Sequence, residues 1–312
     1  MITAPVDRRL RTGTRGSALA LAQSGSIGDR IAEIAGGRAE LIRIRTIGDV
    51  NQGPLAMIGG TGVFVLEVRS RLLAGDVDVI VHSLKDLPTT PYPGIGLGAV
   101  PVREDPADAL CARDGLTLDT LPRGASVGTG SPRRSAQLLR LRPDLAVQAI
   151  RGNVDTRLGL VATGTLDAVV LAAAGLARLD RTEAITQRLP AELMLPAPAQ
   201  GALGVEARAA DVSESWYADA LRAVDDPITR AAVTAERSLL NALEAGCTAP
   251  VGAYATVDGT RITLTGAVIA VDGGAEVRGT AVGDLDDPAA LGRELAADLL
   301  GRGAAGLLAA GR

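Results

Sequence analysis

The chain has 312 residues, a formal net charge of −4 and a pI near 5.2. This length exceeds what one hydrophobic core usually organises, so we expect two or three domains. The acidic balance argues against binding to nucleic acid, and no apolar run approaches the roughly 20 residues that span a bilayer, so we expect neither nucleic acid nor a membrane as a partner.

The first hundred residues alternate strand-like runs with helical patterns. Strands are predicted at residues 10–14, 39–45 and 77–82, and helices at 17–35 and 63–74. A second round starts near residue 108, with strands at 126–130, 145–150 and 166–174 and helices opening near 131 and 154. This alternation is typical of mostly parallel sheets covered by helices on both faces.

Two segments rich in proline and glycine, PVREDPAD and LPAPAQGALGVEAR, are interpreted as hinges. The strand-like run at 202–207 is expected to return to the first domain. From residue 227 the pattern changes to a helix, a Gly-Cys-Thr-Ala-Pro loop, strands at 251–257, 262–271 and 275–282, and a C-terminal helix. Asp-Gly turns between these strands predict an antiparallel α+β domain.

The segment VDVIVHSLKDLPTT brings the only histidine, His82, the only lysine, Lys85, and Asp86 together at a strand end. Strand ends are where α/β proteins place their ligands. Asp86 as a turn carboxylate and His82 as a hydrogen-bonded structural residue are the plainer interpretations of each residue alone. The concentration of rare residue types favours a functional site.

Arginines recur where a predicted strand passes into a helix. In VGTGSPRRSAQLLRLRP, Ser131 is a predicted N-cap and Pro132 the first helical residue, as Asn153 is a predicted cap in IRGNVDTRL. Arg133 and Arg134 then occupy a first helical turn, where the helix dipole favours anions. IRGNVDTRL and TRGSALA repeat the pattern with Arg151, Arg157 and Arg15. Solvated surface arginines are the alternative for each motif, because the chain uses arginine almost exclusively. Together the motifs predict a ligand that carries several carboxylates.

The two cysteines have different settings, and two cysteines are too few to indicate an oxidising compartment. Cys111 lies in the apolar run ADALCAR and is interpreted as a small buried hydrophobe. Cys247 follows a long helix and precedes Pro250, so we expect an exposed loop thiol that takes part in the function of the protein. A thiol-dependent hydrolase lacks an evident base, and no Cys/His spacing indicates a metal.

Five segments in order, VHSLKDLP, VGTGSPRRSAQL, RGNVDTRL, LPAPAQGALGVE and GCTAPVGA, resemble the signature segments of the porphobilinogen deaminase (hydroxymethylbilane synthase) family. The resemblance implies an α/β fold of two periplasmic-binding-protein-like (type II) domains joined by two hinges, plus a small C-terminal α+β domain with a three-stranded antiparallel sheet. The corresponding ranges are 1–101 plus 202–222 for domain 1, 106–197 for domain 2 and 227–312 for domain 3.

The same resemblance implies a cytoplasmic transferase of tetrapyrrole and heme biosynthesis. No heptad pattern or large apolar face demands assembly, so we expect a monomer. It would condense four porphobilinogen molecules head to tail on a dipyrromethane cofactor, release ammonia and, after hydrolysis, yield hydroxymethylbilane. Cys247 would hold the cofactor through a thioether, and Asp86 would be the catalytic carboxylate. Further residues implied to contact the cofactor are Lys85, Asp86, Thr129, Ser131, Arg133, Arg134, Arg151 and Gly152. Those implied to bind substrate are Arg15, Ser17, Arg151, Arg157 and Arg178.

One loop departs from the family pattern. GPLAMIGGTGVF carries Met57 and Thr61 where many members of the family have lysines. We therefore do not expect gating of the site by lysine charges. The rival function is that of a two-lobed binding protein for an anionic small molecule, without catalysis, which would leave Cys247 unexplained.

Overall fold

The computed structural model describes residues 8–44, 62–245 and 249–310. The chain divides into two compact units. The first unit is Met1–Arg103 with Ala202–Arg230, and the second is Glu104–Gly201 with Ala231–Arg312. Among the described residues, no helix is long and apolar enough to cross a membrane.

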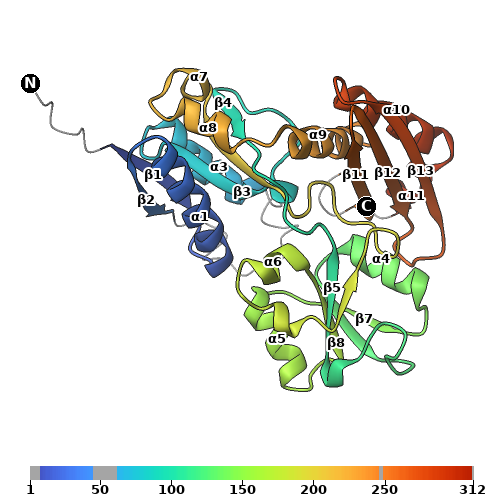
Figure 1. Ribbon diagram of the computed structural model, residues 1–312. Helices are drawn as coiled ribbons and strands as arrows, with labels where there is room; N and C mark the ends of the chain where they lie inside the picture. Colours follow the sequence, from blue (N-terminus) through green and yellow to red (C-terminus); the bar gives the residue numbers. More distant parts are fainter. Residues whose placement is uncertain (1–7, 45–61, 246–248, 311–312) are drawn as a thin grey trace, which may run out of the picture. The chain divides into compact units, whose positions relative to one another are not determined.

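The first unit is built on a five-stranded sheet with the order β2-β1-β3-β10-β4. Figure 1 labels β1, β2, β3 and β4 of this sheet. Strand β1 runs parallel to β2 and β3, whereas β10 is antiparallel to both of its neighbours. The strand predicted at 202–207 does therefore return to the first sheet. The strands are β1 (Arg9–Thr14), β2 (Arg38–Arg43), β3 (Val79–Ser83), β4 (Ile95–Ala99) and β10 (Leu203–Arg208).

Helices cover both faces of this sheet because successive strand residues point to opposite sides. Helices α1 (Ala18–Ile34) and α8 (Ala218–Val224) pack on one face, around Leu10, Val79 and Val205. Helix α3 (Gly62–Leu73) packs on the other, around Val68, Leu72 and Ile80. A short helix, α7 (Asp211–Glu214), follows β10.

A second five-stranded sheet, with the order β7-β6-β8-β5-β9, forms part of the second unit and repeats the strand pattern of the first. Its strands are β5 (Asp108–Ala112), β6 (Ser126–Thr129), β7 (Ala146–Ala149), β8 (Ala168–Ala172) and β9 (Gln187–Leu189). In both sheets one strand, β10 or β5, opposes the rest, so the prediction of mostly parallel sheets is confirmed. The helices are α4 (Pro132–Leu141), α5 (Val154–Ala162) and α6 (Ala173–Ala177).

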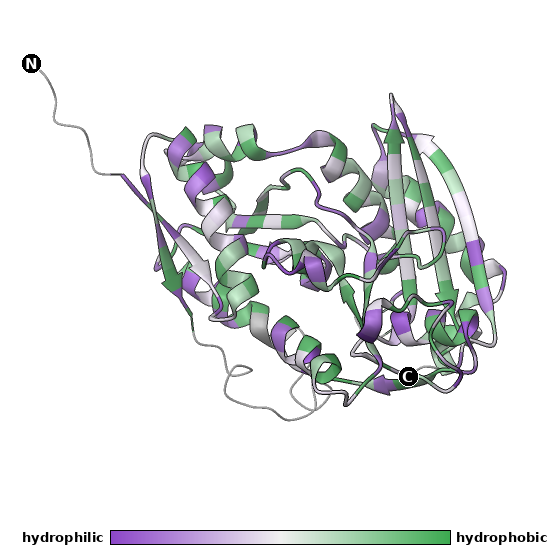
Figure 2. Ribbon diagram, turned by 60° about the horizontal axis from the view of Figure 1, so that its bottom comes forward, coloured by the Kyte–Doolittle hydropathy of each residue, from purple (hydrophilic) through white to green (hydrophobic). Residues whose placement is uncertain are grey.

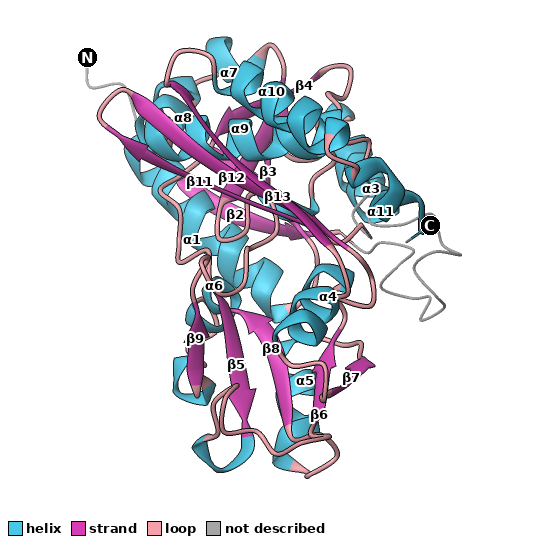
Figure 3. Cartoon of the chain, turned by 90° about the vertical axis from the view of Figure 1, so that its right-hand side faces the viewer, coloured by secondary structure: helices cyan, strands magenta, loops and turns pink. Residues whose placement is uncertain are grey.

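The antiparallel sheet β11-β12-β13, also in the second unit, is formed by Val251–Asp258, Arg261–Ile269 and Glu276–Asp284 (Figure 3). Helix α9 (Pro227–Ala242) precedes this sheet, as predicted, and helices α10 (Pro288–Gly301) and α11 (Ala304–Ala310) follow it. Leu239, Leu264 and Leu295 belong to the core that joins this sheet to its helices. Figure 2 shows green and purple residues alternating along the helices, as expected for amphipathic helices.

Two sequence predictions need correction, and two short strands were missed. The run 166–174 is not one strand, because β8 ends at Ala172 and the next two residues, Ala173 and Ala174, begin α6. The C-terminal helix is two helices, α10 and α11. The short strands β4 and β9 were not predicted. The proposed boundary between domains 2 and 3 stays a prediction, since residues 106–197 and 231–312 both belong to the second unit.

Candidate functional site

Asp86 ends a single 3₁₀ turn, Leu84–Asp86, which directly follows β3. Leu84 is fully buried, and its N–H donates to the carbonyl of Ala202 at 3.0 Å. The N–H of Leu87 closes the turn on the carbonyl of Leu84 at 3.2 Å. The turn is thus anchored by its first residue, while the Asp86 side chain remains exposed and Lys85 is half-buried. This leaves the carboxylate accessible to a ligand.

Arg15 and Ser17 leave the same edge of the first sheet as Asp86. Strands β1 and β3 pair in parallel through Thr12 and Val79, so the residues that follow each strand emerge on the same side. Ser17 caps α1, and its Oγ accepts a hydrogen bond from the N–H of Ala20 at 3.3 Å. Arg15 is half-buried.

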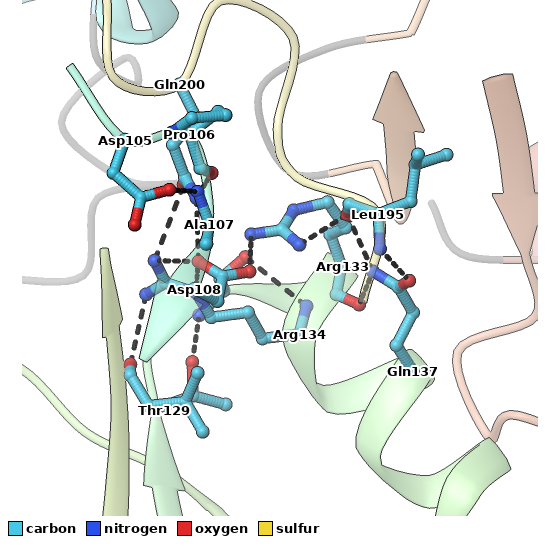
Figure 4. A network of polar contacts seen from close by, with 12 residues as sticks. Asp105, Pro106, Ala107, Asp108, Thr129, Arg133, Arg134, Gln137, Leu195 and Gln200 are labelled. Carbon is cyan, nitrogen blue, oxygen red and sulfur yellow. Dashed lines mark hydrogen bonds and ion pairs between the residues drawn. The ribbon is translucent and has the colours of Figure 1, made fainter. Parts of the chain in front are cut away.

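Arg133 and Arg134 lie in a buried network around Asp108 (Figure 4). Arg133 Nη2 donates to Asp108 Oδ2 at 2.8 Å, and Arg134 donates to Oδ1 from Nη2 at 2.7 Å and from Nε at 2.9 Å. Gln200 Nε2 also donates to Asp108 Oδ1 at 2.8 Å. Asp108 is 0% exposed and the two arginines 3% and 5%. The alternative of two solvated surface arginines is therefore wrong.

Backbone carbonyls hold the remaining edges of these guanidinium groups. Arg133 Nη1 donates to the carbonyl of Leu195 at 2.7 Å, and Arg134 Nη1 to that of Val170 at 3.1 Å. Both arginines therefore have a structural role, and their implied contacts to the cofactor stay a prediction. Ser131 caps α4 by accepting from the N–H of Arg134 at 3.5 Å, and the buried Thr129 hydroxyl accepts from the N–H of Ser131 at 3.2 Å. The predicted cap and first-turn proline are confirmed.

The charges of this network do not cancel. Burial alone would raise the pKa of Asp108, but the charges of Arg133 and Arg134, with hydrogen bonds from Arg134 and Gln200, hold that pKa well below its ordinary value. Burial lowers the pKa of Arg133, and Asp108 partly offsets this effect. Two guanidinium groups share one carboxylate, which leaves one excess positive charge in a buried setting.

Arg157, on α5, adds a second positive charge. Burial lowers its pKa and the charge of Arg134 lowers it further. Within the described part of the chain its buried Nε has no hydrogen-bond partner, and no carboxylate pairs with the group. Because buried cations are normally paired, the arrangement of Arg134 and Arg157 is suited to a bound anion.

The segment between β7 and α5 carries Arg151 at the same edge of the second sheet. Gly152 has a φ of +106°, a conformation that side chains rarely adopt. Asn153 caps α5 through its Oδ1, which accepts from the N–H of Thr156 at 2.8 Å. Strands β6 and β7 are parallel, so residues 130–134 and 150–157 leave the second sheet at the same edge. Arg151 is exposed.

Arg178 follows α6 and reaches the segment between β9 and β10. Its Nη2 donates to the carbonyl of Gly201 at 2.6 Å, and burial lowers the pKa of the Arg178 guanidinium against an opposing effect of Glu104.

Sequence reasoning missed another contact to the segment between β9 and β10. Glu236, on α9, is 0% exposed and accepts from the N–H groups of Ala199 at 2.6 Å and Ala255 at 2.8 Å.

Of the two cysteines, Cys111 lies among the described residues and Cys247 does not. Cys111, in β5, is 3% exposed and burial raises its pKa to about 12, which confirms its interpretation as a small buried hydrophobe. The predicted anchor, Cys247, and the loop residues Met57 and Thr61 lie outside the described residues. His82 Nε2 lies 3.2 Å from Oε2 of Glu206, at ion-pair distance but outside hydrogen-bond geometry, so the interpretation of His82 as a hydrogen-bonded structural residue stays a prediction.

Comparisons with known proteins identify a family. Residues 10–215 match the family model "Porphobilinogen deaminase, dipyromethane cofactor binding domain", and residues 230–301 match "Porphobilinogen deaminase, C-terminal domain". "Porphobilinogen deaminase 1" of Streptomyces avermitilis is 53% identical, covering 97% of this chain and 98% of that protein. "Porphobilinogen deaminase" of Thermobifida fusca is 53% identical over 94% of each chain.

A likeness to solved structures is more distant. A periplasmic substrate-binding protein of an ABC transporter from Coxiella burnetii aligns with a TM-score of 0.44 and 13% identity, covering 73% of this chain and 96% of that one.

Proposed function

The chain belongs to the porphobilinogen deaminase family, and from this premise we propose which of its residues carry the reaction. The activity itself is that of a porphobilinogen deaminase, a transferase (hydroxymethylbilane synthase) that uses a dipyrromethane cofactor and takes porphobilinogen as substrate. The comparisons support this activity over a binding protein without catalysis.

The observation that carries the proposal is the excess positive charge at the edge of the second sheet. Dipyrromethane and porphobilinogen carry acetate and propionate side chains, which are anions at neutral pH. Among the described residues, Arg134 shares its only carboxylate partner with Arg133, and Arg157 has no such partner. Both groups fit carboxylate ligands by charge.

We assign the cofactor to Lys85, Asp86, Thr129, Ser131, Arg133, Arg134, Arg151 and Gly152, and the substrate to Arg15, Ser17, Arg151, Arg157 and Arg178. Arg133 and Arg134 act mainly through the charge that their cluster retains, because most of their donors bond to Asp108 and to backbone carbonyls. When bound, the cofactor supplies a tethered pyrrole to which substrate units are added.

Asp86 is assigned the acid–base and electrostatic role. Its carboxyl group protonates the departing aminomethyl nitrogen of porphobilinogen, which leaves as ammonia. The resulting carboxylate then stabilises the positive charge on the substrate fragment, because an anion fixed beside a developing cation lowers the barrier. The exposed side chain on an anchored turn suits this role.

Cys247 is proposed as the covalent anchor of the cofactor, since a thiolate is the nucleophile able to form a thioether with an electrophilic methylene carbon. The intact mass of the purified protein tests the assignment. The wild type should carry two additional pyrrole units, and Cys247→Ser should show the bare polypeptide mass. Cys111→Ala is the matched control and should keep the adduct, because Cys111 is buried in β5.

An adduct that persists in Cys247→Ser, or a bare wild type after supply of porphobilinogen, would contradict the anchor. We also propose that the protein acts as a cytoplasmic monomer. Light scattering coupled to size-exclusion chromatography tests the monomer, for which the chain mass is 31.7 kDa.

A further inference from the structure

The end of β3, which leads into the turn Leu84–Asp86, is contacted by side chains on both faces of the first sheet. His82 and Ser83 are the last two residues of β3. Successive residues of a strand point to opposite faces, so each of the two requires a separate contact. Both contacts lie within the first unit.

His82 lies on the face that α3 covers. Its Nε2 is 3.2 Å from Oε2 of Glu206, a polar contact at ion-pair distance but outside hydrogen-bond geometry. Arg69, on α3, holds Glu206 with two hydrogen bonds, from Nη2 at 2.6 Å and from Nε at 3.0 Å. The Arg69 guanidinium also lies over the ring of Tyr92, 5.0 Å from its centroid. Glu206 is therefore held by Arg69, and Arg69 is itself held against Tyr92.

Ser83 lies on the opposite face, against α1. Its Oγ is 3.1 Å from Nε2 and 3.2 Å from Oε1 of Gln23. Gln23 is 5% exposed. The two contacts restrain consecutive residues from opposite sides.

The backbone ladder gives less support at this end of the strand. The pairing of β3 with β1 covers Val79 and Ile80, whereas the pairing with β10 continues to Ser83. Residues 81–83 thus have ladder partners on one edge, in β10. Side-chain contacts there take over the restraint that a second strand gives elsewhere in a sheet.

We propose that Glu206, held by Arg69, is a positioning residue for Asp86 and acts through His82. Glu206 does not touch the substrate. It fixes the end of β3, and with it the turn Leu84–Asp86, in the orientation that catalysis requires. This inference rests on the role proposed for Asp86.

Buried ion pairs often contribute only to stability, so the test separates positioning from stability. We expect Glu206→Gln to lower kcat by about 10-fold to 100-fold with KM changed less than about twofold, because a misplaced carboxylate affects the chemical step. The intact mass should still show the cofactor. The control, Arg11→Met, removes the 2.6 Å ion pair with Asp78 just before the other end of β3. It should lower the melting temperature and leave kcat unchanged.

A second pair of variants keeps the test valid if Glu206→Gln does not fold. His82 is partly exposed, and its side chain can be exchanged for one that keeps a polar donor. His82→Gln should retain most of kcat, whereas His82→Leu should lose it about as strongly as Glu206→Gln. Wild-type kcat in both Glu206→Gln and His82→Leu, or an equal loss of kcat in Arg11→Met, would overturn the inference.

Asp86→Asn distinguishes this failure from a failure of the proposed function. Full turnover in Asp86→Asn would remove the catalytic role of Asp86, and the positioning role with it. An inactive Asp86→Asn alongside fully active Glu206→Gln and His82→Leu would overturn the positioning role alone.

Discussion

At the scale of single residues, Asp108 is the carboxylate on which the arginine cluster depends. We expect Asp108→Asn to lower the free energy of unfolding by about 3–5 kcal/mol at pH 7, because it leaves two buried guanidinium groups without a counter-charge. Urea unfolding measures this change. Since the folded pKa lies below the ordinary value of 3.8, the difference between wild type and variant should be constant above about pH 4 and shrink as the pH falls further.

A difference that persisted unchanged at the lowest accessible pH would show that the amide acts through packing and not through charge. Gln200→Leu is a useful companion, because it removes one donor to Asp108 without changing the charge of the cluster. We expect Gln200→Leu to lower the free energy of unfolding by about 1–3 kcal/mol, which is less than the loss expected for Asp108→Asn.

Arg157 gives a prediction about binding. We expect Arg157→Met to raise KM for porphobilinogen by about tenfold or more, because a charge-assisted hydrogen bond to a ligand carboxylate contributes about 1.5–3 kcal/mol. Steady-state kinetics provides the measurement. Arg140→Met is the control, since Arg140 pairs with Glu276 at 3.1 Å and is half-exposed. A KM at the wild-type value for Arg157→Met would remove Arg157 from the binding site.

At the scale of secondary-structure elements, the C-terminal helices offer a matched pair of substitutions. A Cβ on Gly306, in α11, would meet no atom within 4 Å, whereas a Cβ on Gly292, in α10, would lie 2.4 Å from the carbonyl oxygen of Ala235. Gly306→Ala should stabilise the protein by about 0.5–1 kcal/mol through helix propensity. Gly292→Ala should destabilise it, because α9 and α10 would have to separate.

Thermal unfolding of the two variants checks this expectation. A stabilising Gly292→Ala would mean that the approach of α10 to α9 is looser than the contact with Ala235 implies.

The elements also show what the sequence alone could predict. The caps Ser131 and Asn153 and the Asp-Gly hairpin turns are local signals, and the structure confirms them. Strand β9 has three residues and β4 contains two glycines, so neither carries a periodic pattern long enough to detect. The partners of Arg133 and Arg134 depend on which strands adjoin, which sequence spacing does not reveal. Asp108 is a charged residue at the start of the otherwise apolar strand β5, and this feature of the sequence could have indicated that it pairs with buried cations.

At the scale of the whole molecule, ion-paired carboxylates govern the response to acid. A hydrogen bond from Arg142 lowers the pKa of Asp144 to about 2, and the backbone N–H of Ser126 lowers that of Asp167 to about 2. Burial alone would raise the pKa of Glu206, yet its contacts with His82 and Arg69 lower it. These groups stabilise the fold above their unfolded pKa of about 4, and this stability is lost as the pH falls through the folded values.

We therefore expect the melting temperature to vary little between pH 8 and pH 5 and to fall steeply below about pH 4. The sequence contains one histidine, so few groups titrate in the intermediate range. Differential scanning calorimetry across this range is the check, and a main loss of stability between pH 5 and pH 7 would contradict it.

The interleaved order of the strands has a consequence for biosynthesis. Strand β4 has β10 as its partner in the first sheet, and β10 is encoded after every strand of the second five-stranded sheet. A nascent chain that has emerged only as far as residue 201 can pair β1 with β2 and β3, but it has nothing to join β3 to β4. The amino-terminal sheet is therefore finished after the five-stranded sheet that follows it in the message, and the ribosome must release residues 203–208 before that first sheet is complete.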